Sequence, residues 1–228
     1  MRPDPSHEEY MRQWVSLYEA TNYDQGLAGY FLSRSHAWLE NAFAPDREFP
    51  RVLEVGAGTG IHLRHVRHRF REYVLTDGSA DMLRQVQLPA DRAGSVQLRV
   101  ADACHLEFED DGFDRLIATH VLEHLERPWE VLREWHRVVK PGGVISLILP
   151  CDPGLGWRLG RQLVARGKFV KAGMEYDYWM AREHINPINN LVALLRYYFP
   201  ERQESWAPLR IPSMDLNLFY LAHLKVQK

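Results

Sequence analysis

Apolar residues along this chain follow two different periods. Short aliphatic runs have the length of buried strands, and we expect strands at 52–55, 72–77, 96–101, 112–119 and 144–149. Elsewhere apolar residues recur at three- and four-residue spacing, most clearly in 129–139, which predicts an amphipathic helix. Strands that alternate with helices are typical of an α/β domain built on a parallel sheet.

The two ends of the chain carry different patterns. Residues 6–44 place large apolar side chains at helical spacings, so we expect two or three helices there. Near the other end, a helix is expected at 189–199. Two strand-like runs at 201–207 and 216–226 follow it, and they predict a terminal antiparallel hairpin.

A glycine-rich turn follows the first predicted strand directly. Gly56, Gly58 and Gly60 stand at every second position. Glycine lets the backbone adopt positive φ and come close to a ligand, because it has no Cβ atom. Apolar residues at helical spacing continue to Phe70, so we expect a helix after the turn. Ligands of open parallel sheets bind at the carboxyl ends of strands, which predicts a nucleotide-like ligand here.

The glycine spacing separates two kinds of nucleotide ligand. A dinucleotide-binding turn has the pattern G-x-G-x-x-G. Here the pattern is G-x-G-x-G, Ile61 stands where the third glycine of that motif would be, and Glu54 precedes the turn. A nearby carboxylate disfavours a pyrophosphate and suits a positively charged ligand, such as the sulfonium and amino groups of S-adenosylmethionine. A nicotinamide-dependent reductase is therefore the weaker alternative.

With this motif the chain resembles the class I S-adenosylmethionine-dependent methyltransferases, in particular those that act on small molecules. The resemblance covers about Val52 to Pro150 and includes Leu122-Glu-His-Leu125 and Lys140-Pro-Gly-Gly143. The proline and the two glycines of the second motif predict a tight turn into the fifth strand. It implies a doubly wound, Rossmann-like α/β fold with a mostly parallel seven-stranded sheet and an antiparallel C-terminal hairpin. An N-terminal helical lid and a helical insertion after the fifth strand are also expected. The implied cofactor is S-adenosylmethionine, and its product is S-adenosylhomocysteine.

The resemblance also implies which residues bind the cofactor. Glu54 with the glycine turn would hold the methionine end, Asp77 the ribose hydroxyls, and Asp102 the adenine amine. Gly78 stands where the family has a bulky apolar residue against adenine, so Met82 is the candidate to replace that contact. The complete expected set is Glu54, Gly56, Ala57, Gly58, Asp77, Gly78, Met82, Asp102, Ala103 and His120.

Two histidines follow the fourth predicted strand. In the family that this chain resembles, the segment after this strand faces both the methionine end of the cofactor and the acceptor. His120 and His124 are therefore candidate catalytic residues. The alternative is that they only orient the turn through hydrogen bonds.

Residues 151–190 form an insertion that is expected to face the acceptor. Its first half, 154–171, holds five basic residues and no acidic residue, interleaved with apolar side chains. Arg158, Arg161 and Arg166 either recognise an anionic group of the acceptor or touch an anionic membrane surface. A solvated helix face is the plainer alternative.

The second half of this insertion is rich in groups that can hold and deprotonate a hydroxyl. His184 is the candidate general base, because histidine ordinarily titrates near neutral pH. Its neighbour Glu183 would point about 100° away on a helix, so the two need not interact. The expected substrate contacts are Tyr18, Tyr23, Tyr30, Arg158, Tyr176, Tyr178 and Glu183.

Composition and charge narrow the function classes. The chain has 228 residues and a formal net charge of −2, which does not point to nucleic-acid binding. Two cysteines are too few for a disulfide framework, which suits a reducing compartment. The first residues lack the apolar segment of a signal peptide, and no run is long enough to span a bilayer. We therefore expect a cytoplasmic protein without a bound metal, whose oligomeric state is open.

We expect a single methyltransferase domain over 1–228. Its expected parts are an N-terminal helical lid at 1–48, a cofactor-binding core at 49–150, an acceptor-side insertion at 151–190, and the last helix and hairpin at 191–228. The predicted function is methyl transfer to a small molecule or biosynthetic intermediate, with oxygen favoured as acceptor atom. The alternatives are a methyltransferase acting on RNA or protein, and a cofactor-binding partner protein without catalysis.

Overall fold

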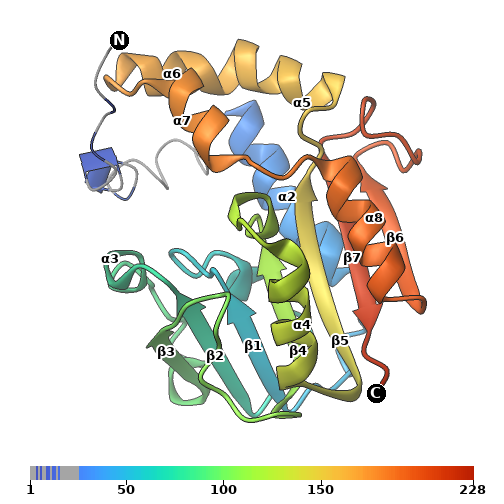
Figure 1. The fold of residues 1–228 in the computed structure, drawn as a ribbon. Helices are drawn as coiled ribbons and strands as arrows, with labels where there is room; N and C mark the ends of the chain where they lie inside the picture. Colours follow the sequence, from blue (N-terminus) through green and yellow to red (C-terminus); the bar gives the residue numbers. More distant parts are fainter. Residues whose placement is uncertain (1–3, 5, 7–8, 11, 14, 16–25) are drawn as a thin grey trace.

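A seven-stranded sheet in the order β3-β2-β1-β4-β5-β7-β6 forms the centre of the computed structural model (Figure 1). The structure describes residues 26–228 and, before them, residues 4, 6, 9, 10, 12, 13 and 15. β1 to β5 run parallel, and β7 runs antiparallel to its neighbours β5 and β6. The strands are β1 (Arg51–Val55), β2 (Glu72–Asp77), β3 (Val96–Val100), β4 (Phe113–Thr119), β5 (Val139–Pro150), β6 (Arg202–Ala207) and β7 (Phe219–Lys225).

Helices cover both faces of the sheet and the carboxyl ends of its parallel strands (Figure 1). α4 and α8 lie on one face, α2 lies on the other, and α5 to α7 lie beyond the strand ends. The longer helices are α2 (Leu27–Glu40), α4 (Pro128–Val138), α7 (Tyr176–Glu183) and α8 (Ile188–Tyr198). The shorter ones are η1 (His62–His65), α3 (Ala80–Leu83), η2 (Ala93–Ser95), η3 (Leu122–His124), α5 (Leu155–Gly160), η4 (Arg161–Ala165) and α6 (Arg166–Lys171).

One hydrophobic cluster on each face of the sheet holds the covering helices against it. α4 begins at Pro128, where the missing N–H of proline has no cost, and it buries Val131 and Trp135 against the sheet. On the opposite face, Leu39 of α2 packs in a cluster with Tyr73 of β2. Burial of one such large apolar side chain contributes about 1.5–3 kcal/mol to stability.

The strands, the long helices and the terminal hairpin agree with the expectations from the sequence. The helix expected after the glycine turn is wrong, because only the 3₁₀ turn η1 forms and the backbone is extended at Val66. The guanidinium of Arg92 donates instead to the carbonyls of Leu63 and Val66, at 3.1 and 3.2 Å. These carbonyls are therefore satisfied without a continued helix.

The Lys140–Gly143 segment also differs from its expected form. It lies inside β5 and does not form a separate turn before that strand. Gly142 nevertheless has a positive φ of 78°, as the turn prediction required. Its N–H donates to the carbonyl of Val226 at 2.8 Å, so the segment pairs with the end of the chain.

A buried ion pair connects α2 to the sheet. The guanidinium of Arg115, on β4, donates to both carboxylate oxygens of Glu40 at 2.6 and 3.1 Å, and both side chains are fully buried. Arg115 Nε also donates to Ser146 Oγ on β5 at 3.0 Å. Burial alone would raise the pKa of Glu40, but the charge of Arg115 and the hydrogen bond with His62 hold it far below its usual range.

Two histidines close to this ion pair are kept uncharged. Burial, reinforced by the positive charge of Arg115, lowers the pKa of His68 to about 4 and the pKa of His223 to about 3. His223 Nδ1 lies 3.0 Å from Ser146 Oγ, and His68 packs edge-on against the ring of Phe49 at 4.9 Å. Protonation of either ring would place a second positive charge close to the guanidinium.

Removal of the arginine should destabilise the fold strongly. We expect Arg115→Met to lower the free energy of unfolding by about 3–5 kcal/mol, because the Glu40 carboxylate then remains buried without its partner. The double variant Arg115→Met/Glu40→Leu should be more stable than this single variant, since neither charge remains. Urea unfolding at neutral pH, followed by circular dichroism, measures both. A single variant as stable as the double variant would contradict this account of the pair.

Stability should also fall as the pH is lowered from 7 to 5. The unfolded chain takes up protons at His68 and His223 near pH ~6.5, whereas the folded chain does so only at about 4 and 3. Each histidine should therefore cost about 2 kcal/mol of unfolding free energy over this range. Urea unfolding at several pH values measures the slope. His223→Gln should flatten it, and His105→Gln, at an exposed position, should not.

Candidate functional site

The glycine turn lies at the carboxyl end of β1, where the strand order reverses between β1 and β4. All three glycines have positive φ: 66° at Gly56, 56° at Gly58 and 76° at Gly60. A Cβ atom on Gly56 would lie only 2.5 Å from Cγ2 of Val121, so a larger residue does not fit there. The N–H of Ala57, which is buried, donates to the carbonyl of Thr76 at 2.9 Å and ties the turn to β2.

Asp77, at the end of β2, joins this turn to the segment that follows β2. Its Oδ2 accepts from the N–H of Gly58 and its Oδ1 from the N–H of Ser79, both at 2.8 Å. Burial raises the pKa of Asp77 although both hydrogen bonds favour the charged form. A carboxylate has about four acceptor positions, so roughly two remain for hydroxyl groups of a ligand.

Glu54 is fully buried in β1, next to the turn. The hydroxyl of Tyr73 donates to its Oε2 at 2.5 Å. Its Oε1 is buried and has no hydrogen-bond partner among the residues that the structure describes. Burial raises the pKa of Glu54, since no cation is paired with it directly. A positively charged ligand group at Oε1 would satisfy this atom and favour the carboxylate form.

The residues expected at adenine lie near the ends of β2 and β3. Met82 is buried in α3, whereas Gly78 is exposed and has open space where a Cβ atom would lie. Asp102 is exposed, and its Oδ1 accepts from the N–H of Cys104 at 2.8 Å. Ala103 is half-buried beside it. This edge of the sheet therefore combines an apolar side chain with an accessible carboxylate.

These residues fit S-adenosylmethionine better than they fit a dinucleotide. Glu54 offers an unpaired carboxylate oxygen to a positive group, and Asp77 offers acceptor positions to the ribose. The positive-φ turn allows close approach to its backbone. A pyrophosphate at the same turn would be repelled by both carboxylates.

Beyond the turn, the segment after β4 and the end of α7 bring three histidines around one buried carboxylate. Glu123, in η3, is buried, and its carboxylate oxygens have no hydrogen-bond partner within the described part of the chain. His120 Nδ1 and His124 Nε2 lie 3.7 and 3.8 Å from Glu123 Oε1. Burial opposes ionisation of Glu123, but His120, His124 and His184 together lower its pKa. In the described residues, no group of three possible ligands is placed to hold a metal ion.

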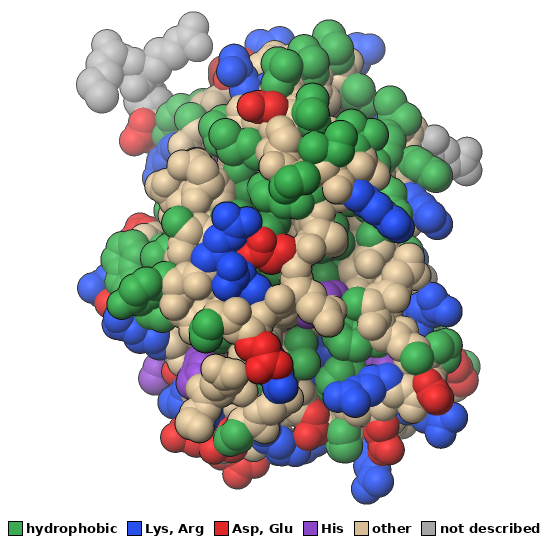
Figure 2. All heavy atoms as spheres, turned by 90° about the vertical axis from the view of Figure 1, so that its right-hand side faces the viewer, with side chains coloured by type: hydrophobic (Ala, Val, Ile, Leu, Met, Phe, Trp, Pro, Cys, Tyr) green, Lys and Arg blue, Asp and Glu red, His purple; other side chains and the backbone are tan. Residues whose placement is uncertain are grey.

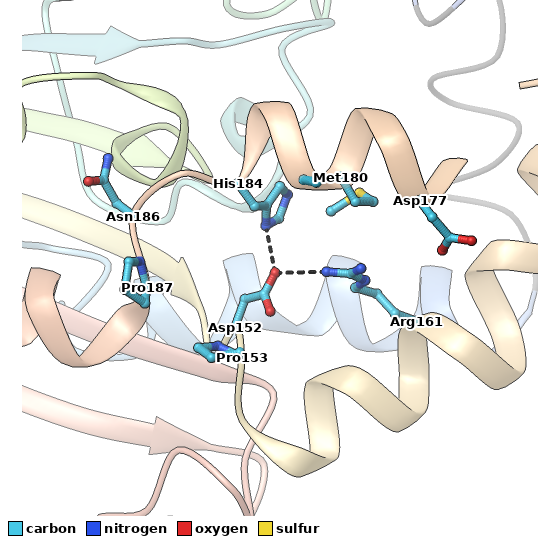
Figure 3. Close-up of a pocket in the computed structure, with 9 residues that line it drawn as sticks. Asp152, Pro153, Arg161, Asp177, Met180, His184, Asn186 and Pro187 are labelled. Atoms are coloured by element: carbon cyan, nitrogen blue, oxygen red, sulfur yellow. Dashed lines mark hydrogen bonds and ion pairs between the residues drawn. The ribbon is translucent and has the colours of Figure 1, made fainter. Parts of the chain in front are cut away.

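A second carboxylate, Asp152, follows β5 and lies between a histidine and an arginine (Figure 3). Its Oδ2 is 3.0 Å from His184 Nδ1 and 3.1 Å from Arg161 Nη1. Burial would raise the pKa of Asp152, but these two partners lower it. The rings of His184 and His124 are 5.0 Å apart and meet edge to face, so the two carboxylate groups belong to one polar cluster.

A cavity of about 220 Å³ lies beside this cluster (Figure 3). Asp152, Arg161 and His184 line it together with Met180 and Asn186. It is smaller than the pockets of about 300–1,000 Å³ that bury whole drug-sized ligands. It can therefore enclose only part of a ligand of that size.

The expected substrate contacts lie outside this cavity. Tyr176 is buried and stacks on Phe169, with a centroid separation of 5.2 Å. The hydroxyl of Tyr178 accepts from Arg182 at 2.9 Å. The backbone carbonyl of Glu183 accepts from His124 Nδ1 at 2.9 Å. These contacts support the walls of the site, so a direct role in acceptor binding has no geometric support here.

Two more expected contacts lie at the surface. Arg158 is exposed on α5, and Tyr30 is 56% exposed on α2. Neither lines the cavity. Tyr18 and Tyr23 lie outside the described residues.

Two residues of the cluster did not emerge from the sequence, Glu123 and Asp152. Glu123 belongs to the Leu-Glu-His-Leu motif, of which only His124 was predicted to be a site residue. Asp152 follows the end of β5. The rule that flags carboxylates at the carboxyl ends of parallel strands would have identified it.

A family model described as a methyltransferase domain matches residues 53–147 of this chain. Phosphatidylethanolamine N-methyltransferase of Cereibacter sphaeroides is 34% identical over 101 residues, which cover 43% of this chain and 49% of that relative. The 27-O-demethylrifamycin SV methyltransferase of Amycolatopsis mediterranei is 31% identical over 121 residues, which cover 49% of this chain and 44% of that relative. The chain thus spans about half the length of these relatives.

Solved structures extend the similarity to the fold of the whole chain. Phosphoethanolamine N-methyltransferase 2 of Haemonchus contortus, in complex with S-adenosyl-L-methionine, superposes with a TM-score of 0.65 at 15% identity. The superposition covers 97% of this chain and 59% of that one. Residues 53–147 are therefore similar to methyltransferase domains, and they lie within a seven-stranded fold that resembles that of the solved methyltransferase.

Proposed function

We propose that this protein transfers the methyl group of S-adenosylmethionine to an oxygen atom of a small molecule. The observation that carries the proposal is the positive-φ glycine turn, which lies among carboxylates at the ends of three parallel strands. Glu54, Asp77 and Asp102 are these carboxylates, and all three fall in the segment that matches the methyltransferase model.

In this proposal, Glu54 and the glycine turn bind the methionine end, Asp77 the ribose, and Asp102 with Ala103 the adenine. When bound, the cofactor supplies an electrophilic methyl group on a positively charged sulfur. The chain itself has to orient the acceptor oxygen in line with that group, exclude competing water and remove the acceptor proton.

His184 is the residue that we assign to proton removal. Asp152 faces its Nδ1 at 3.0 Å, which favours the tautomer with the proton on that nitrogen. Nε2 then keeps its lone pair and accepts the hydroxyl proton, while Asp152 stabilises the imidazolium that forms. Arg161 holds the Asp152 carboxylate in place and ionised.

His124 and His120 act as positioning residues in the same proposal. His124 Nδ1 donates to the carbonyl of Glu183 and so fixes the C-terminal end of α7, next to His184. The carboxylate of Glu123 lies between His120 and His124, 3.7 and 3.8 Å from their ring nitrogens. Protonation or loss of either imidazole ring would therefore change the net charge around Glu123, close to the proposed acceptor position.

The acceptor atom is the finer part of the proposal. One relative is named for nitrogen methylation and another for an oxygen, so the relatives do not decide it. A histidine paired with a carboxylate beside the cavity favours oxygen, because an alcohol must lose its proton during transfer. A neutral amine does not need this base.

The first experiment follows a radioactive methyl group from the cofactor into a fractionated extract of the source cell. Label in a small-molecule or lipid fraction, with mass spectrometry of the product, would support the proposal and identify the acceptor. Label in RNA or protein would reject the proposed acceptor class. Tight cofactor binding without any transfer would instead favour a partner protein without catalysis.

Cofactor affinity should depend on the space at the glycine turn. We expect Gly56→Ala to weaken S-adenosylmethionine binding at least tenfold, because its Cβ atom would approach Val121 to 2.5 Å at a φ that alanine disfavours. Isothermal titration calorimetry measures the change. Gly94→Ala is the matched control, since open space surrounds that position and its φ is ordinary. Equal affinities of the two variants would contradict the assignment of the turn.

Catalysis should depend on His184 without any change in cofactor binding. We expect His184→Gln to lower kcat on an oxygen acceptor by about 10²–10⁴, the usual contribution of a general base. The dissociation constant of S-adenosylmethionine should stay within about twofold. Steady-state kinetics and calorimetry measure both values, with His136→Gln, on α4 and far from the cavity, as the control. If His184→Gln retained most of its kcat, another group would have to remove the proton.

A further inference from the structure

The helical insertion after β5 carries a row of leucines on its outer face. α5, η4 and α6 follow one another without a break from Leu155 to Lys171 (Figure 1). Leu155, Leu159 and Leu163 are spaced four residues apart, which places them along one side. Their exposed fractions are 54%, 50% and 79%. Such large exposed fractions on successive turns show that, among the residues that the structure describes, little packs on this side of the helix.

The loop between β6 and β7 extends the same surface. The N–H groups of Leu155 and Gly156 donate to the side chain and the carbonyl of Asp215, at 3.0 and 2.9 Å. The loop is therefore fastened to the start of α5. We name the combined exposed residues the apical surface: Leu155, Leu159, Leu163, Leu209, Ile211 and Leu216. Figure 2 shows hydrophobic side chains gathered at this end of the molecule, with lysine and arginine side chains at the margins.

Positive charge surrounds the apical surface. Arg158, Lys171 and Arg210 are exposed and form no ion pair with any residue in the described part of the chain. Segment 154–171 contains no acidic residue. An acid in the neighbouring loop, Asp215, accepts with its side chain from the N–H of Leu155. The surface therefore combines aliphatic side chains with an excess of unpaired cations.

This combination favours an anionic lipid surface over a protein partner. Protein interfaces are enriched in aromatic residues and arginine and depleted in lysine, and leucine is under-represented among their strongest contacts. Helices that lie in a membrane interface have aliphatic residues on one side and Lys or Arg beside them. No helix in the described residues is long and apolar enough to cross a membrane, so contact would be limited to the interface.

We propose that the apical surface docks on an anionic lipid bilayer. The leucine side chains enter the boundary between headgroups and acyl chains, while the three unpaired cations contact anionic headgroups. This inference goes beyond methyl transfer and does not depend on it, because docking needs neither cofactor nor acceptor. Failure of the proposed enzymatic function would leave it intact, and the converse also holds.

Vesicle sedimentation tests the proposal. The purified chain is mixed with large vesicles of phosphatidylcholine, alone or with one third phosphatidylglycerol, and the bound fraction is measured. We expect binding to the anionic vesicles only, weakening as salt rises from 0.05 to 0.5 M because screening shortens the electrostatic range. Arg158→Gln/Lys171→Gln should reduce the partition constant roughly 30-fold, since each basic residue near such a surface contributes about one factor of five.

The leucines need a separate variant and a matched control. Leu159→Gln/Leu163→Gln should reduce binding at least tenfold at constant charge, because two buried aliphatic side chains are lost from the interface. Leu98→Gln changes an aliphatic residue of β3, at the opposite edge of the sheet and 43% exposed, and should bind like the parent. Circular dichroism checks that every variant is folded.

Two results would overturn the proposal. One is a lack of binding to anionic vesicles at low salt, or equal binding by the parent and both patch variants. The other is a concentration-dependent dimer, detected by analytical ultracentrifugation, that the leucine variant abolishes. That dimer would identify a second copy of the chain as the occupant of the surface.

Discussion

The buried pair of Arg115 and Glu40 is the interaction on which the arrangement of the site depends. A charge enclosed by apolar residues must be paired. The position of Glu40, at the end of α2, is therefore set by its partner Arg115 on the sheet. The same carboxylate lies 3.1 Å from Nε2 of His62, in η1, directly after the glycine turn. Nδ1 of His62 in turn lies 2.9 Å from Nδ1 of His36 on α2. Helix, turn and sheet are thereby fixed relative to one another beneath the cofactor residues.

Carboxylates and histidines are divided between two ends of one continuous polar region. At β1 and β2, carboxylates face a backbone turn, which suits a positively charged ligand that also carries hydroxyl groups. At β4 and β5, carboxylates face imidazoles, which suits proton transfer. The edge-to-face contact of His36 with His120, at 6.3 Å, lies between the two ends. The two proposed roles, holding a cation and moving a proton, would thus lie next to each other along one edge of the sheet.

The insertion after β5 contributes to both the interior and the exterior of this edge. On its inner side, Arg161 contacts Asp152 and orders the group that we assign to catalysis. On its outer side, Leu159 and Leu163 face solvent. One helix therefore presents a paired cation to the cavity and aliphatic side chains to the surroundings. This division between the two sides cannot be read directly from the sequence, where basic and apolar residues alternate. On a helix, neighbouring residues point about 100° apart and so lie on different sides.

Local patterns along the chain were enough to predict the parts of this protein that depend on local chemistry. The strand positions, the positive φ of the glycine turn and the hairpin are all readable from period, glycine placement and chain order. The short η1 was not, because the carbonyls that end it are bound by Arg92, which lies nearly thirty residues further along.

Which charged groups meet depends on how the helices pack on the sheet. Arg115 and Glu40 are 75 residues apart, and His124 meets the carbonyl of Glu183 across 59 residues. The periodic patterns of the sequence do not predict such pairings. They arise when helices pack on a sheet and each buried charge requires a partner. The same reason explains why Asp152, unremarkable in the sequence, lies at the centre of the candidate site.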